Sequence, residues 1–336
     1  MEVQNAWNTD RRIIQDTTPM LRYRPGSDFA AWQTEARQKL TELLGLPLMK
    51  SCDPQFRICY EKKHEDFTEI RFTFCSEEGY VVPAHLLLPA HSARPCKVVI
   101  CLQGHSTGMH ISLGRAVYPG DEATISGGDR DFARRALREG YAAIAMEQRY
   151  MGECGGSEKG PGCLTGTAMT ALLLGRCAIG ERVWDVMRLI DVMRTQFDFL
   201  DSEQIVLLGN SGGGTTTFYT ACIDDRIQCA VPSCSVCTYR DSIVAMHHCV
   251  CNYIPNIARY FDMGDLAGLI APRKLIMVSG RADPIFPANG VAETAHIAQE
   301  LYQAAGCPDH FELVTGDGSH RFYADPAWNV IHRMMD

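Results

Sequence analysis

The segment Gly209-Asn210-Ser211-Gly212-Gly213 decides the fold, because it joins a short apolar run at 205–208 to a stretch of helical character. A serine in this strand-turn-helix context is typical of a nucleophile elbow, a sharp turn that presents the hydroxyl at the carboxyl end of a sheet. Glycines two before and two after the serine allow the strained turn and a close helix-strand approach. We therefore expect Ser211 to be a nucleophile.

The patterns on either side of this segment alternate between strand and helix, which is typical of parallel βαβ units. Predicted strands cover 97–102, 141–146, 205–208, 227–231, 274–279 and 311–315, and predicted helices cover 132–139, 182–200, 211–222 and 291–305. The run at 97–102 is almost continuously apolar, as expected of a strand covered on both faces. The sequence therefore predicts an α/β fold, a mostly parallel central sheet with helices on both faces.

The region before residue 97 has a different pattern. Strand-like runs at 56–62, 67–75 and 80–88 are separated by polar turns and indicate an antiparallel N-terminal edge. Before them, Asp28 can cap and Gly45 can end an accessory helix at 28–44.

Length and composition place the chain among globular proteins. Its 336 residues, 46% of them hydrophobic and 21% charged, can bury a large core. We expect an N-terminal accessory helical segment at 1–50 and one α/β domain at 51–336, with an insertion at about 238–269.

Charge and hydropathy argue against several classes of partner. Lys and Arg number 32 against 40 Asp and Glu, a net charge of −8, and no long run of one sign appears. We therefore expect neither nucleic acid nor a membrane surface as partner. No stretch approaches the roughly 18 apolar residues of a membrane span. A small, uncharged or weakly charged molecule is the expected partner, and a homo-oligomer is left open.

The 15 cysteines are an odd number, and the first 16 residues lack the apolar core of a signal peptide. This combination predicts thiols in a reducing compartment, so we expect a cytoplasmic protein.

One cluster offers ligand types that zinc uses, and its members are Cys234, Cys237, His247, Cys249 and Cys251. A cysteine-rich chain produces such spacings by composition, so we expect packing thiols here and neither a metal site nor a cofactor.

A serine nucleophile needs a histidine to remove its proton and a carboxylate to orient that histidine. In the order serine, acid, histidine, the acid follows a later strand and the histidine follows the last one. Asp283 comes just after the strand at 274–279, and His320 just after that at 311–315. We therefore predict a triad of Ser211, Asp283 and His320, although an aspartate before proline is also typical of a plain turn.

Acyl transfer also needs two N–H donors for the oxyanion. One is the N–H after the nucleophile, here of Gly212, and the other should follow the strand at 97–102. We expect the His105 amide there, with Gly104 next, although a plain glycine turn at a strand end is the alternative.

The predicted insertion leaves the sheet at its carboxyl edge, where substrates of α/β proteins bind. We therefore name His247, His248 and Tyr253 as candidates for the wall of a substrate pocket. The alternative is a surface excursion without substrate contact.

These motifs resemble those of the serine α/β-hydrolase superfamily, in the branch of dienelactone hydrolases and acetyl xylan esterase-like proteins. The resemblance covers roughly 80–336, and 28–45 is similar to the N-terminal helix that this branch often carries. It implies an α/β-hydrolase fold, with the triad and the oxyanion donors in the roles given above.

Two positions depart from that branch. Dienelactone hydrolases use a cysteine nucleophile where this chain has Ser211, and many relatives place a histidine before the glycine where this chain has Gln103. The resemblance implies a serine esterase without cofactor, acting through an acyl-enzyme on short-acyl, acetyl-type esters of a sugar or similar alcohol. An aminopeptidase- or amidase-like hydrolase is the alternative, followed by a non-catalytic protein that binds metal through its Cys/His segment.

Overall fold

Nine strands form one sheet in the computed structural model, which describes residues 5–91, 93–155 and 165–335. The strands are β1 (Arg57–Lys63), β2 (Phe67–Glu77), β3 (Tyr80–Pro89), β4 (Cys96–Leu102), β5 (Ala142–Met146), β6 (Leu200–Asn210), β7 (Ile227–Ser233), β8 (Lys274–Gly280) and β9 (Phe311–Gly316). Their order across the sheet is β1-β2-β3-β5-β4-β6-β7-β8-β9. The pairs from β1 to β5 are antiparallel and all pairs from β5 to β9 are parallel. The predicted mostly parallel sheet with an antiparallel N-terminal edge is confirmed.

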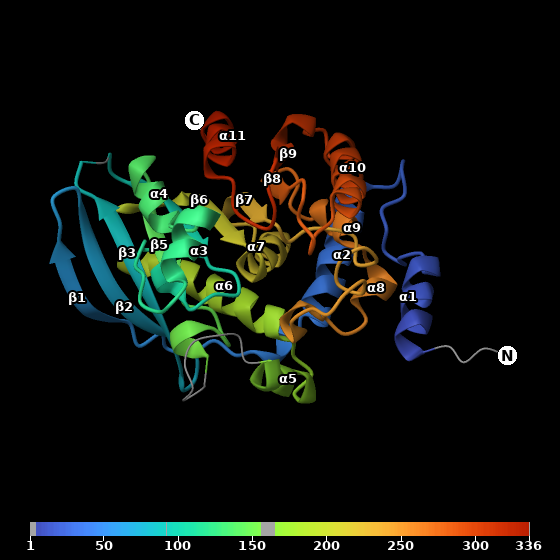
Figure 1. The fold of residues 1–336 in the computed structure, drawn as a ribbon, viewed down its shortest axis with the longest axis horizontal. Helices are drawn as coiled ribbons and strands as arrows, with labels where there is room; N and C mark the ends of the chain where they lie inside the picture. Colours follow the sequence, from blue (N-terminus) through green and yellow to red (C-terminus); the bar gives the residue numbers. More distant parts are fainter. Residues whose placement is uncertain (1–4, 92, 156–164, 336) are drawn as a thin grey trace.

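Helices lie along both faces of this sheet (Figure 1). They are α1 (Ala6–Asp16), α2 (Phe29–Leu43), α3 (Asp121–Gly128), α4 (Phe132–Arg138), α5 (Thr165–Leu173), α6 (Ala178–Gln196), α7 (Gly212–Ile223), α8 (Ile257–Tyr260), α9 (Met263–Ala267), α10 (Ala288–Ala304) and α11 (Ala324–Met335). Among the described helices, none combines the length and the apolar character needed to cross a bilayer.

The apolar side chains of the strands belong to two separate hydrophobic clusters, because successive side chains of a strand point to opposite faces of the sheet. In β4, Val98 and Ile100 join the cluster formed with α2, α6, α7 and α10. Val99 and Cys101 join the other cluster, which is formed with α4 and α11. Both faces of the parallel strands are therefore buried, which explains the continuous apolar run in the sequence.

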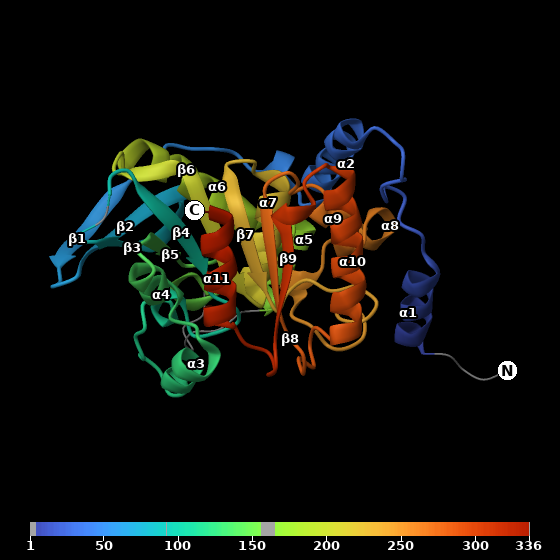
Figure 2. The ribbon, with the colours of Figure 1, turned by 90° about the horizontal axis from the view of Figure 1, so that it is seen from above.

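The N-terminal region agrees with its prediction and adds one helix. The Asp28 side chain accepts the Ala31 N–H at 3.0 Å and caps α2, and Gly45 follows that helix with φ of +72°. Helix α1 was not predicted, and none of its residues is buried. Figure 2 shows α1 at the opposite end of the molecule from β1.

The predicted helix at 182–200 was wrong at both of its ends. Helix α6 begins earlier, at Ala178, and it ends at Gln196, since Phe197 leaves the helical region with φ of −129°. Leu200 instead pairs with Cys96 and begins β6. An apolar residue at 200 fits the helical period and the strand equally well, so the pattern could not separate them.

Strand β1 forms one edge of the sheet, and all of its residues are exposed. Four of its seven residues carry charge, namely Arg57, Glu61, Lys62 and Lys63. Its pairing with β2 is interrupted by an irregularity between Ile58 and Tyr60.

Candidate active site

Ser211 lies in the turn that joins β6 to α7, as the sequence predicts. Its φ of +55° and ψ of −124° are a strained conformation, which costs a residue with a side chain on the order of 1–3 kcal/mol. The turn is held by the Ser211 N–H, which donates to the Ser233 carbonyl at 2.8 Å. A Cβ on Gly209 would collide with the Gly213 carbonyl, so the helix can lie this close to the strand only above a glycine. This is the geometry of a nucleophile elbow.

The loop after β4 lies directly beside the elbow. A Cβ on Gly104 would lie 2.8 Å from the Ser211 Cβ, and a Cβ on Gly212 would lie 3.0 Å from the His105 ring. Gly212 is the first residue of α7, where the N–H has no partner within the helix. The structure therefore brings all three predicted donor residues to Ser211, and their role in binding an oxyanion stays a prediction.

Asp283 and His320 form a hydrogen-bonded pair at the same edge of the sheet. Asp283 follows β8 and is 4% exposed, and its Oδ2 lies 2.8 Å from Nδ1 of His320, which follows β9. The Asp283 Oδ1 accepts the N–H groups of Ile285 and Phe286 at 2.8 and 3.2 Å. Burial alone would raise the pKa of Asp283, but the hydrogen bonds and the His320 charge outweigh burial and lower it. An ionised Asp283 can thus hold one tautomer of His320.

The His320 ring is supported from one side by Phe286. The two rings are stacked, with centroids 5.9 Å apart and planes 16° from parallel. Within the described residues, the Ser211 hydroxyl and His320 are not hydrogen-bonded to each other. Such catalytic bonds often shorten only when substrate binds, and the triad assignment stays a prediction.

A cavity of about 700 Å³ opens at this edge of the sheet. Its wall includes His105, Ser106, Asp121, Arg130, His320 and Arg321. His320 and the loop that carries His105 therefore face one common space. Another part of the wall comes from α3 and the residues before it, which the sequence did not assign to the site.

Asp121 anchors that unpredicted wall. It is 2% exposed, and its carboxylate accepts the Thr107 hydroxyl at 2.5 Å and the N–H groups of Val117 and Tyr118. Burial would raise the pKa of Asp121, but these hydrogen bonds and one to His110 outweigh burial and lower it to about 2. The sequence offered one sign of this part of the wall, the long connection between residues 102 and 132, since connections of that length are usually functional.

The three predicted pocket-wall residues lie outside the lining of this cavity. His248 is buried and lies 3.3 Å from the Ser242 hydroxyl, and its ring makes a T-shaped contact with Phe286. Burial, followed by the neighbouring His105 charge, lowers the pKa of His248 to about 4, so it is neutral at pH 7. The Tyr253 hydroxyl donates to the Ile243 carbonyl at 3.2 Å, and His247 is exposed. A role of these residues in the pocket wall stays a prediction.

A second buried carboxylate, Glu147, contacts the loop that follows β4. It follows β5, is 2% exposed, and accepts the Met109 N–H at 3.1 Å and the Glu153 N–H at 3.3 Å. Burial raises the pKa of Glu147 to about 7 in spite of these hydrogen bonds.

This shift predicts a pH dependence of stability. A carboxyl group whose pKa is raised in the folded state stabilises the fold fully below its unfolded value of about 4.5 and loses that contribution as pH rises through 7. We expect Glu147→Gln to gain on the order of 3 kcal/mol in unfolding free energy, relative to the wild type, between pH 4.5 and pH 8. Urea unfolding at both pH values measures this change, with Glu61→Gln on exposed β1 as control. A Glu147→Gln effect that is equal at both pH values contradicts the expectation.

The sheet order, the elbow and the position of each loop at the carboxyl edge define an α/β hydrolase. The chain belongs to the Abhydrolase family, whose model matches residues 8–327.

Individual relatives agree with this membership. The chain is 25% identical over 296 residues to the Bacillus subtilis (strain 168) protein "Putative hydrolase YtaP", covering 86% of this chain and 94% of that protein. Among solved structures, a "putative acetyl xylan esterase" from Bacteroides fragilis superposes with a TM-score of 0.78 at 18% identity, over 94% of this chain and 83% of the other. A glucuronoyl esterase from Solibacter usitatus superposes with a TM-score of 0.68 at 16% identity, over 96% and 98%. These two structures show a shared fold.

Proposed function

We propose that this protein is a serine carboxylic-ester hydrolase that works through an acyl-enzyme. The observation that carries the proposal is the 2.8 Å hydrogen bond between Asp283 and His320, at a cavity that His320 and His105 line together. The elbow at Ser211 supplies a nucleophile whose neighbouring loop suits an oxyanion. Ser211, Asp283 and His320 follow β6, β8 and β9 in the order serine, acid, histidine, which supports the proposed chemistry.

The reaction proceeds in two halves. His320 takes the proton of the Ser211 hydroxyl as its oxygen attacks the acyl carbon, and Asp283 stabilises the resulting imidazolium. The N–H groups of Gly212 and His105 stabilise the oxyanion, and His320 returns the proton to the leaving alcohol. Water then attacks the acyl-enzyme by the same route and releases the acid. The residues named supply every proton transfer that this scheme needs.

The cavity wall and the relatives both support one class of substrate. The wall offers hydroxyl and guanidinium groups, from Ser106, Arg130 and Arg321, which suits an alcohol rich in hydroxyls. Acetyl xylan esterase and glucuronoyl esterase are the names of structures that share the fold. We therefore propose short-acyl esters, of acetyl type, on a sugar or similar alcohol.

A series of chromogenic esters tests this substrate class. Each methylene that fits a pocket gains roughly 1 kcal/mol, and each that does not fit meets a steric wall. We expect kcat/KM for acetyl or propionyl esters to exceed that for octanoyl esters at least about tenfold, with aminoacyl anilides slower still. The same series with a second leaving group serves as control for the chromophore.

Two outcomes would change the proposal. Activity that rises through the octanoyl ester would indicate a long acyl channel instead of a short pocket. Anilides that are cleaved faster than esters would favour the amidase or peptidase alternative.

A further inference from the structure

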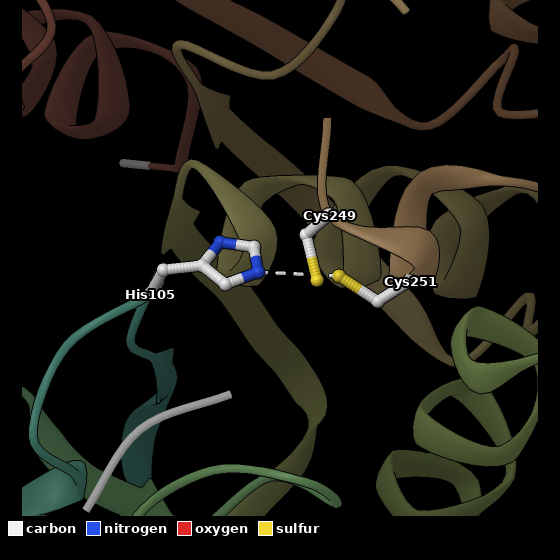
Figure 3. A group of neighbouring side chains, drawn as sticks. All are labelled: His105, Cys249 and Cys251. Atoms are coloured by element: carbon white, nitrogen blue, oxygen red, sulfur yellow. Dashed lines mark hydrogen bonds between the residues drawn. The ribbon is translucent and has the colours of Figure 1, made fainter. Parts of the chain in front are cut away.

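Three side chains of metal-ligand type meet beside the elbow (Figure 3). His105 comes from the loop after β4, and Cys249 and Cys251 flank the start of a short 3-10 helix, η4 (Val250–Asn252), in the insertion after β7. The Cys251 Sγ lies 3.2 Å from the His105 Nε2, and the three donor atoms all lie within 4.8 Å of one another. Both sulfurs point toward the imidazole in Figure 3.

The spacing of these atoms fits a tetrahedral metal ion. Zinc bonds of about 2.3 Å to sulfur and about 2.0–2.1 Å to nitrogen place the donors of one ion roughly 3.6–3.8 Å apart. The Cys251–His105 distance of 3.2 Å is shorter than that value and the other two donor distances are at most 4.8 Å, so side-chain rotations would bring the three donors to an ion. Two thiols and an imidazole select a soft ion such as Zn²⁺ over Mg²⁺ or Ca²⁺, which prefer oxygen.

Both segments that supply the donors are held in place by packing. Cys251 is fully buried in a small cluster with Ala168 and Ala178. The next residue, Asn252, accepts a hydrogen bond from Thr215 of α7 at 3.3 Å. On the other side, the His105 ring lies against Gly212, which limits the movement of this ring.

The other two cysteines of the cluster predicted from the sequence, Cys234 and Cys237, make different contacts. Cys234 lies near Asp283 and His320, whose mutual hydrogen bond is already explained by the triad. The Cys237 Sγ lies 3.9 Å from the Pro287 carbonyl. The structure thus separates these two thiols from the pair at 249 and 251, with which the sequence had grouped them, and adds His105 instead.

We propose that His105, Cys249 and Cys251 bind one Zn²⁺ ion. Three protein ligands leave a fourth position of the tetrahedron for water or another small ligand, which can enter from the cavity that His105 lines. The bound ion links the loop after β4 to the insertion after β7. Each thiol loses its proton on binding and the neutral imidazole loses none, so two protons leave for each ion bound.

A metal titration of the untagged full chain tests the proposal. The protein is kept reduced with a phosphine, stripped with a chelator and titrated with Zn²⁺ against a chromogenic competitor. We expect one ion per chain, a Kd below about 1 µM and release of about two protons per ion at pH 7. Co²⁺ in place of Zn²⁺ should give thiolate-to-cobalt charge-transfer absorption and the visible bands of a tetrahedral site.

Variants of the partly exposed ligands make the test specific. Cys249→Ser and His105→Gln should each weaken Zn²⁺ binding at least about a hundredfold, while circular dichroism verifies that both fold. Cys307→Ser, at a thiol of similar burial outside the cluster, should bind Zn²⁺ like the wild type. Cys237→Ser should also bind it normally. Absence of stoichiometric binding overturns the proposal, and so does binding that survives both ligand variants or that is lost equally in Cys307→Ser.

Discussion

Replacing Ser211 with alanine is expected to lower ester turnover at least about a thousandfold. The change removes the oxygen that forms the acyl-enzyme in the proposed reaction while leaving the turn itself intact, because alanine keeps the Cβ. A fluorophosphonate should label the wild-type chain once and should not label the variant. Labelling by intact-protein mass spectrometry and turnover of an acetyl ester measure the two effects.

Ser106→Ala is the matched control for this change, since Ser106 is a serine of the cavity wall. That variant should keep its fluorophosphonate label and remain within about tenfold of wild-type turnover. Undiminished turnover in a folded Ser211→Ala protein would reject Ser211 as the nucleophile. Loss of the label in Ser106→Ala alone would move the assignment to that residue.

Asp283→Asn should cost on the order of a thousandfold in kcat or more. The amide is of the same size and can still accept the N–H groups of Ile285 and Phe286, so the loop should keep its shape. An amide nitrogen facing His320 Nδ1 favours the wrong tautomer and cannot stabilise the imidazolium. Steady-state kinetics across a pH series measures the loss, and the rise of kcat with pH should be altered as well.

Asp317→Asn is the control for that experiment, because Asp317 lies close to His320 in the sequence and its side chain is 92% exposed. Its kcat should stay within a few-fold of the wild type. A large loss in Asp317→Asn together with an active Asp283→Asn would show that the acid has been misassigned.

The elbow and the positions of Asp283 and His320 after their strands were accessible from the sequence because each depends on a local pattern. Ser211 is marked by glycines within two residues, and Asp283 and His320 each follow an apolar run of strand length. The order of strands at the carboxyl edge then brings these loops together, and the fold class itself predicts that order.

The wall of the cavity and the His/Cys cluster could not be predicted in this way. Helix α3 is short and depends on the buried Asp121, whose hydrogen bonds to the preceding loop have no periodic pattern. His105 and Cys251 are 146 residues apart, so proximity in the chain favoured Cys234 and Cys237 as neighbours of Cys251. His105 and the two cysteines meet only because the loop after β4 and the insertion after β7 both lie at the carboxyl edge of the sheet.

The charged edge strand β1 has a consequence for the behaviour of the chain at high concentration. An exposed edge presents unpaired backbone groups that a second molecule could extend into a continuous sheet. In a symmetric antiparallel pairing of two β1 strands centred on Tyr60, Arg57 of each strand would face Lys63 of the other. Like charges placed opposite each other destabilise such a pair, and the irregularity at Ile58 and Tyr60 disturbs its register. Strand β1 therefore protects this protein against edge-to-edge aggregation.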